Sequence, residues 1–154
     1  MIDDLIIKRH RPGEEIPMGL LLEADPEPEF IKHYVKEGEL FIVSRYDNLV
    51  GVFVLMGIDF GRVEIKNMAV SMKYRGKGIG RKMLNHIIQY SKDKGHIKIR
   101  VCTGNSSIRA FQLYQKEGFD IIEVDKGFFA RNYAEPIWEG GLICEDRVIL
   151  EKDL

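Results

Sequence analysis

Hydrophobic residues along the chain follow two periods, and each change of period marks a boundary between predicted elements. Short runs rich in β-branched and aromatic residues, which are typical of strands, occupy residues 4–9, 40–46, 49–57, 62–70, 97–103, 120–124 and 146–150. Stretches whose apolar residues recur at helical spacing, which predict helices, occupy residues 14–24, 28–38, 79–94 and 105–118. The order of these elements predicts a seven-stranded sheet flanked by helices.

Closely spaced strands predict an antiparallel arrangement for most of this sheet. A hairpin over residues 40–57 is expected to turn at Asp47 and Asn48, a pair compatible with a type I′ turn. A helix separates residues 62–70 from 97–103, and such a strand–helix–strand unit implies a right-handed crossover between parallel strands. We therefore expect a mixed, mostly antiparallel sheet of the α/β or α+β class.

A glycine-rich turn joins strand 62–70 to the helix that follows it. Gly76, Gly78 and Gly80 lack the Cβ atoms that would keep an anion away from the backbone. The first amides of the helix have no partner within it, and they lie at the positive end of its dipole. The basic residues around the turn are Arg75, Lys77, Arg81 and Lys82. These features predict a site for a phosphate-bearing cofactor.

The spacing within the turn excludes two common phosphate sites. A P-loop needs Lys followed by Ser or Thr directly after the last glycine, whereas Gly80 is followed by two basic residues. A dinucleotide fingerprint needs the spacing G-x-G-x-x-G, whereas this turn reads Gly76-x-Gly78-x-Gly80. From Arg75 onward the turn resembles instead the Arg/Gln-x-x-Gly-x-Gly/Ala signature of the GNAT superfamily, the acyl-CoA-dependent N-acyltransferases.

A second segment carries the same resemblance. Members of the superfamily have an Asn that opens a helix, followed by an Ala-x-x-x-Tyr-x-x-x-Gly-Phe run. The matching residues are Asn105, Ala110, Tyr114, Gly118 and Phe119. Asn105 or Ser106 suits the N-cap of this helix, and Gly118 suits a left-handed stop after it. The two segments together extend the resemblance over roughly residues 40–125.

The resemblance implies how acetyl-CoA would be held. Its pyrophosphate would lie on the amides of Arg75, Gly76, Lys77, Gly78, Ile79 and Gly80. Its pantetheine arm would pair like an added strand with Met68, Ala69 and Val70, and the Val70 N–H would point at the thioester oxygen. Asn105 would contact the pantetheine from the other side, and Lys77 or Lys82 would reach the ribose phosphate. The fourth and fifth strands would splay apart to make room.

Two residues are candidates for the proton transfers of acyl transfer. Tyr114 would protonate the departing thiolate, although a tyrosine at this helical position is also an ordinary core residue. Glu64, six residues before Val70, would take the proton from the amine, as a glutamate does in some family members. Glu64 could equally alternate with Lys66 on a solvated strand face, and many members deprotonate the amine through water and backbone carbonyls.

Composition restricts the remaining classes of function. The 154 residues, with 45% hydrophobic and 31% charged residues, predict one soluble domain over residues 1–154. A net charge of −1 predicts no nucleic-acid or membrane partner. The acidic start at residues 1–4 predicts no signal peptide, so we expect a cytoplasmic protein. Cys102 and Cys144 are expected to be free thiols, and the four scattered histidines predict no metal site.

The function implied is transfer of an acetyl group from acetyl-CoA to a primary amine of a small molecule or protein, directly within a ternary complex. A non-catalytic module that binds or senses acyl-CoA is the alternative, and an enzyme for longer acyl chains is another. Residues 125–145 are a long aromatic-rich connection, which we expect to wall the acceptor site. Glu64, Glu135 and Glu139 would suit a cationic amine there. Because dimers are common in this fold, a homodimer is a possible assembly.

Overall fold

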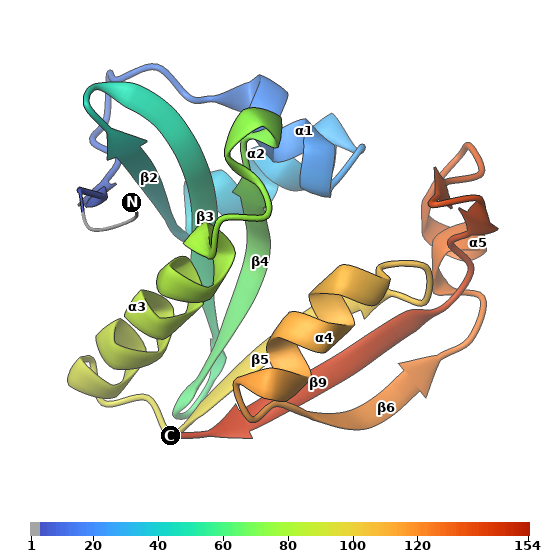
Figure 1. Ribbon diagram of the computed structural model, residues 1–154. Helices are drawn as coiled ribbons and strands as arrows, with labels where there is room; N and C mark the ends of the chain where they lie inside the picture. Colours follow the sequence, from blue (N-terminus) through green and yellow to red (C-terminus); the bar gives the residue numbers. More distant parts are fainter. Residues whose placement is uncertain (1–3) are drawn as a thin grey trace.

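A seven-stranded mixed sheet runs through the computed structural model, which describes residues 4–154 (Figure 1). In spatial order its strands are β1 (Ile6–Arg9), β2 (Glu39–Arg45), β3 (Asn48–Asp59), β4 (Arg62–Val70), β5 (Lys98–Gly104), β9 (Arg147–Asp153) and β6 (Asp120–Asp125). Neighbouring strands are antiparallel except β4 and β5, which are parallel. The predicted fold class is therefore confirmed.

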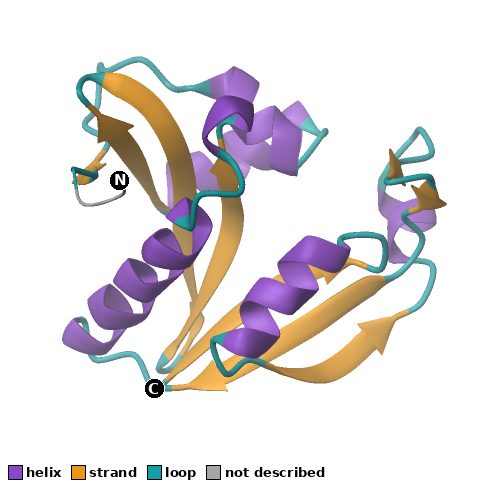
Figure 2. Cartoon of the chain, in the orientation of Figure 1, coloured by secondary structure: helices purple, strands orange, loops and turns teal. Residues whose placement is uncertain are grey.

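Helices cover both faces of this sheet (Figure 2). They are α1 (Met18–Ala24), α2 (Pro28–Glu37), α3 (Ile79–Asp93), α4 (Ile108–Lys116) and the short α5 (Phe128–Asn132), with a 3-10 turn, η1, at Met72–Tyr74. A small hairpin of β7 (Trp138–Glu139) and β8 (Leu142–Ile143) follows α5. Among residues 4–154, no helix is long and apolar enough to cross a membrane. The expectation that no signal peptide is present rests partly on residues 1–3, which lie outside the described residues.

The sheet divides into two arms where β4 and β5 separate. These strands pair only from Arg62 opposite Lys98 to Ile65 opposite Val101. Directly after Ile65 the β3–β4 register shifts and leaves Lys66 as an extra residue in β4, and such a bulge bends a strand and increases its twist. We call β1–β4 with α1–α3 the N-terminal arm, and β5, β6 and β9 with α4 and α5 the C-terminal arm. The splay implied by the family resemblance is present, and the two arms diverge visibly in Figure 1.

Two hydrophobic cores lie on opposite faces of the N-terminal arm, and the one beneath α3 continues into the C-terminal arm. Successive residues of β3 face opposite sides, so Phe53 packs with α3 whereas Val52 packs with α1 and α2. Met83 and Leu84 of α3 are fully buried, as the predicted apolar stripe requires. Full burial of each such side chain contributes roughly 1.5–3 kcal/mol. This packing fixes the start of α3 against the end of β4.

In the N-terminal arm, two predicted boundaries are wrong, each for a local reason. The β2–β3 hairpin turns at Tyr46 and Asp47, with φ of 49° and 64°, and not at Asp47 and Asn48. Asn48 instead pairs with Arg45 as the last rung of the ladder. The helix predicted over 14–24 begins only at Met18, because Pro17, which has no N–H, occupies its N-cap position.

Candidate active site

A cavity of about 1080 Å³ occupies the opening between the two arms. Its lining comes from the end of β4, the glycine-rich turn, the first turn of α3, β5 and α4. On the other side of the sheet it is bounded by the α1–α2 connection and by the segment that carries α5 and β7. The cavity therefore has walls from both arms and from both sides of the splayed sheet.

The end of β4 presents an unpaired backbone edge to this cavity. The Ser71 N–H donates to the Val50 carbonyl of the preceding hairpin at 2.7 Å. Because successive amides of a strand point to opposite edges, the Val70 and Met68 N–H groups point away from β3 and toward the opening. Among residues 4–154 no strand pairs with this edge beyond Ile65, where the β5 pairing stops. Met68, Ala69 and Val70 all line the cavity, and their pairing with pantetheine stays a prediction.

The glycine-rich turn continues from this edge to the start of α3. Gly76 and Gly78 have φ of 74° and 82°, in the left-handed region that favours glycine. Gly78 is the N-cap of α3, and Ile79, only 2% exposed, anchors the first turn in the core. The cavity is lined by Arg75, Gly76, Gly78, Ile79 and Gly80, whereas Lys77 lies outside the lining. The free amides of this first turn therefore open onto the cavity.

Arg75 braces the turn with its side chain. Its Nε donates to the Val70 carbonyl at 2.9 Å, and its Nη2 contacts the Glu23 carboxylate at 3.0 Å. The guanidinium therefore ties the turn to both β4 and α1. Backbone amides, and not this side chain, are the groups left free for a phosphate.

Tyr114 lies in α4, where a phenol faces the cavity from an apolar setting. The side chain is 6% exposed, its ring lies 5.5 Å from that of Phe119, and it belongs to the cavity lining. Burial raises the pKa of the Tyr114 hydroxyl well above its usual value, because desolvation disfavours the phenolate. Tyr114 is therefore a protonated hydrogen-bond donor at neutral pH.

Glu64 lies beside the cavity but outside its lining. It is 8% exposed, and its carboxylate pairs with Lys66 Nζ at 2.9 Å. Lys66 itself does line the cavity. The role of Glu64 as a base stays a prediction.

Residues 126–146 connect β6 to β9, and we call them the C-terminal segment. Asn105 holds the end of this segment to the end of β5. Its Oδ1 accepts hydrogen bonds from the backbone N–H groups of Glu145 at 2.8 Å and Asp146 at 3.0 Å. The predicted N-cap of α4 is wrong, since Ser107 occupies that position and makes no side-chain cap. Asn105 is outside the cavity lining, and its contact with pantetheine stays a prediction.

A hydrogen-bonded cluster that sequence reasoning missed joins the two arms. Asp25 accepts from the Tyr34 hydroxyl at 3.1 Å and from the Tyr133 hydroxyl at 2.8 Å. Asn67 of β4 donates to the Tyr34 oxygen at 2.8 Å and to the Leu21 carbonyl at 3.0 Å. All of these side chains except that of Leu21 line the cavity. No local pattern could reveal the cluster, because Asp25 and Tyr133 are 108 positions apart.

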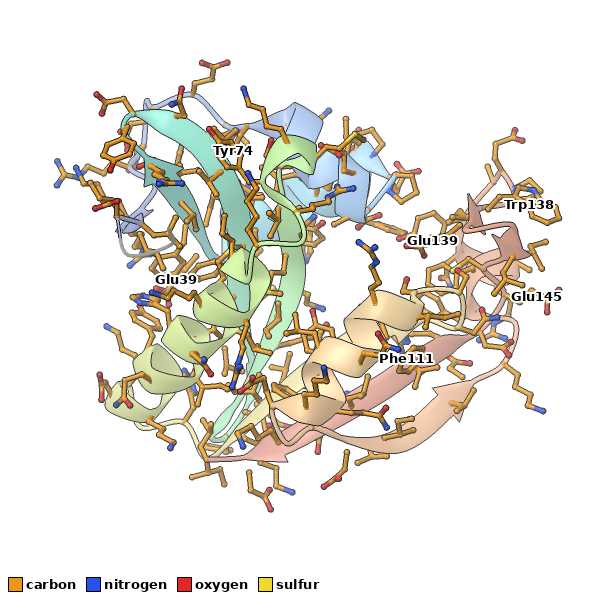
Figure 3. The ribbon with its side chains drawn as sticks, in the orientation of Figure 1. Glu39, Tyr74, Phe111, Trp138, Glu139 and Glu145 are labelled. Carbon is orange, nitrogen blue, oxygen red and sulfur yellow. The ribbon has the colours of Figure 1, made fainter. Side chains whose placement is uncertain are left out.

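The expected group of three acceptor-site carboxylates is only partly present. Of Glu64, Glu135 and Glu139, the last alone belongs to the cavity lining of the described chain. Glu139 accepts from the hydroxyls of Ser107 at 2.6 Å and Ser106 at 3.3 Å. Figure 3 shows it at the end of the C-terminal arm, facing the opening.

The two cysteines are free in the structure, and neither is an activated nucleophile. Burial raises the pKa of the Cys102 thiol to about 11, and it also raises that of the Cys144 thiol. Both side chains line the cavity as protonated thiols. Within residues 4–154 no cluster of His, Cys, Asp and Glu has the composition of a metal site.

Comparisons with known proteins agree with this geometry. The model of the acetyltransferase (GNAT) family matches residues 9–119. The chain is 42% identical over 135 residues to a protein named uncharacterized N-acetyltransferase YvbK from Bacillus subtilis (strain 168), covering 88% of this chain and 87% of that protein.

Solved structures give the same result over almost the whole chain. A GNAT family acetyltransferase from Elizabethkingia anophelis, with acetyl-CoA bound, is 43% identical, has a TM-score of 0.96 and is matched over 99% of both chains. A structure named IAA acetyltransferase from Bacillus cereus ATCC 14579 is 40% identical, with a TM-score of 0.92 over 97% of this chain and 99% of that one. The resemblance carried by the glycine-rich turn and the Tyr114 helix is thus confirmed, and the chain is an acetyltransferase that belongs to the GNAT family.

Proposed function

We propose that this acetyltransferase moves the acetyl group of acetyl-CoA directly to a primary amine, within one ternary complex. The observation that carries the proposal is the unpaired edge of β4, which leads without interruption into the free amides of α3. An extended pantetheine arm that ends in a pyrophosphate has the shape and hydrogen-bonding groups for this surface. A structure 43% identical to this chain contains bound acetyl-CoA, which supports the same ligand here.

The nucleotide end of the cofactor has a basic groove available beside α3. This second hollow, of about 560 Å³, is lined by Arg81, Arg109, Gln112, Leu113, Lys116 and Glu117. Arg81 is paired with Glu117 at 2.8 Å. Arg109 lines both this groove and the main cavity, and we propose that it contacts the cofactor between its pyrophosphate and its ribose phosphate.

A backbone N–H and the Tyr114 hydroxyl would each assist one step of the transfer. The amine nitrogen attacks the thioester carbon, and the Val70 N–H donates to the oxygen that becomes negative. When the C–S bond breaks, the electron pair leaves on sulfur, and the Tyr114 hydroxyl donates its proton to the thiolate. Because burial holds the pKa of Tyr114 above that of a thiol, donation accompanies the build-up of charge on sulfur and does not precede it.

Removal of the amine proton is the step with two candidate routes. Glu64 would accept the proton through a water molecule, since its carboxylate lies outside the cavity lining and is held by Lys66. Water and backbone carbonyls alone are the other route.

Both arms supply walls of the cavity, so we propose that they act together as one catalytic domain.

An acceptor screen that detects the free thiol of CoA tests this proposal. We expect a primary amine in a broad panel to accelerate thiol release at least about tenfold over hydrolysis of acetyl-CoA without amine. Measurement of CoA binding in parallel separates two kinds of failure. Tight CoA binding with no acceleration by any amine would contradict the enzyme and would favour a module that only binds acyl-CoA.

A further inference from the structure

The acidic groups that line the acceptor side of the cavity already have hydrogen-bond donors. Asp25 accepts from two tyrosine hydroxyls and also from the backbone N–H of Glu27 at 3.1 Å. Glu139 accepts from two serine hydroxyls. Each carboxylate is therefore stabilised within the protein, and neither needs a ligand cation to complete its hydrogen bonding.

Arg147, by contrast, lines the same cavity with unused donors. It is the first residue of β9, and it directly follows Asp146, whose backbone N–H donates to Asn105. Its Nε is buried and has no partner, while the side chain as a whole is 31% exposed. Its Nη2 forms an ion pair with an Asp125 oxygen at 3.7 Å, a separation too long for a hydrogen bond. A buried N–H without an acceptor is costly, and the exposed part of the side chain faces a cavity that a ligand oxygen could occupy.

The surroundings leave the Arg147 charge incompletely balanced. Arg131 donates to the other Asp125 oxygen at 2.6 Å, so one carboxylate serves two guanidinium groups. Lys66, the nearby cation of the lining, is already paired with Glu64. Within the described chain, Arg147 is thus the cation on the acceptor side whose charge and N–H donors are available to a ligand.

One aromatic ring lies against this cation, and three more rings continue from it along the cavity. The Arg147 guanidinium lies 4.2 Å from the centre of the Phe128 ring, which holds it in a fixed orientation. Phe128, Phe129, Tyr133 and Phe30 form a series of contacts at 5.1, 5.4 and 5.3 Å between ring centres, and all four line the cavity. The acceptor side therefore combines one available guanidinium with an apolar, aromatic wall.

We propose that Arg147 binds a carboxylate of the acceptor, and that the acceptor is an amine carrying a carboxylate and an apolar or aromatic group, as in an aromatic amino acid. A planar guanidinium with free N–H groups matches a carboxylate with two parallel hydrogen bonds. The proposal rests on the proposed acetyl transfer. It replaces the cationic amine expected from Glu64, Glu135 and Glu139 as the substrate class.

Phenylalanine and phenethylamine make the test, because they differ only in the carboxylate. For the unaltered enzyme we expect kcat/KM to be at least about tenfold higher for phenylalanine, the discrimination typical of a charge-assisted pair. In Arg147→Gln the ratio of the two kcat/KM values should fall toward one. Arg131→Gln is the matched control, since Arg131 contacts the same Asp125 but does not line the cavity. That variant should keep the ratio of the unaltered enzyme.

A binding measurement keeps the test decisive even without turnover of either amine. N-acetylphenylalanine and N-acetylphenethylamine are titrated into the CoA complex by calorimetry. We expect the carboxylate compound to bind about tenfold more tightly, and Arg147→Gln to abolish the difference. Equal affinities, no binding of either compound, or an unchanged preference in Arg147→Gln would overturn the carboxylate site. Absence of CoA binding would instead contradict the proposed acetyl transfer itself.

Discussion

Tyr114 and Arg147 illustrate opposite uses of burial at single residues. Burial keeps the Tyr114 phenol protonated, which suits a group that donates to a leaving thiolate. Burial of the Arg147 Nε leaves one N–H of a charged group without a hydrogen-bond acceptor, although the guanidinium has a long ion pair with Asp125. In both cases the apolar surroundings, and not the side chain alone, determine the role that we assign.

Replacing Tyr114 with Phe should remove the proton donor while preserving the packing of α4. We expect kcat to fall about 10²-fold, the lower range for a general acid, and CoA affinity to change only a few-fold. The raised pKa also predicts that kcat of the unaltered enzyme shows no loss from phenolate formation between about pH 7 and 9, because the neutral form is favoured throughout.

Steady-state kinetics with saturating acetyl-CoA measure this effect. Tyr90→Phe is the matched control, since the Tyr90 hydroxyl bonds to Glu39 and lies outside the cavity lining. Its kcat should match that of the unaltered enzyme. A Tyr114→Phe enzyme that keeps kcat within a few-fold would exclude Tyr114 as the acid.

At the scale of elements, the turn between β4 and α3 combines shape and charge. Its left-handed glycines let the chain reverse close to the strand end, and the helix that follows supplies free amides and a positive dipole end. Arg75 fixes the turn to Val70. The cofactor site thus depends on how two elements meet, with little contribution from side chains.

Gly76→Ala and Gly95→Ala form a matched pair that separates strain from binding. The two glycines have φ of 74° and 86°, and an added Cβ meets nothing within 4 Å at either position. Each substitution should therefore lower the free energy of unfolding by about 1 kcal/mol. Only Gly76 lines the cavity, so Gly76→Ala alone should weaken CoA binding, by about tenfold.

Thermal unfolding and CoA titration of both variants check this expectation. A similar loss of stability in the two variants shows that backbone strain is matched. Equal CoA affinity in both would mean that the turn does not hold the cofactor.

For the whole molecule, local patterns predicted much of the fold and the cofactor side of the site. The predicted strand over 62–70 coincides with β4, and the apolar stripe predicted for α3 is buried. These two predictions succeed because the position of turn glycines and the spacing of hydrophobic residues are local properties of the chain. Tyr114 came instead from the family resemblance, through its offsets to Ala110 and Gly118, and its role as the acid stays a prediction.

The acceptor side depends on contacts between distant parts of the chain, which no local pattern reveals. Asp25 meets Tyr133, and Arg147 meets Phe128, only because the two arms and the C-terminal segment close around the cavity. The bulge at Lys66 that opens the sheet is likewise set by the register of β3 against β4. Of the carboxylates that the sequence suggested for the acceptor side, Glu139 alone lines the cavity of the described chain.

The central claim is that the open edge of β4 and the first amides of α3 hold an acyl-CoA between the two arms. Amide hydrogen exchange, followed residue by residue by NMR with and without CoA, tests it most directly. The account predicts that CoA slows exchange at Val70, Gly76 and Gly78, whose N–H groups gain ligand acceptors. Unchanged exchange at these amides in the presence of saturating CoA would contradict it.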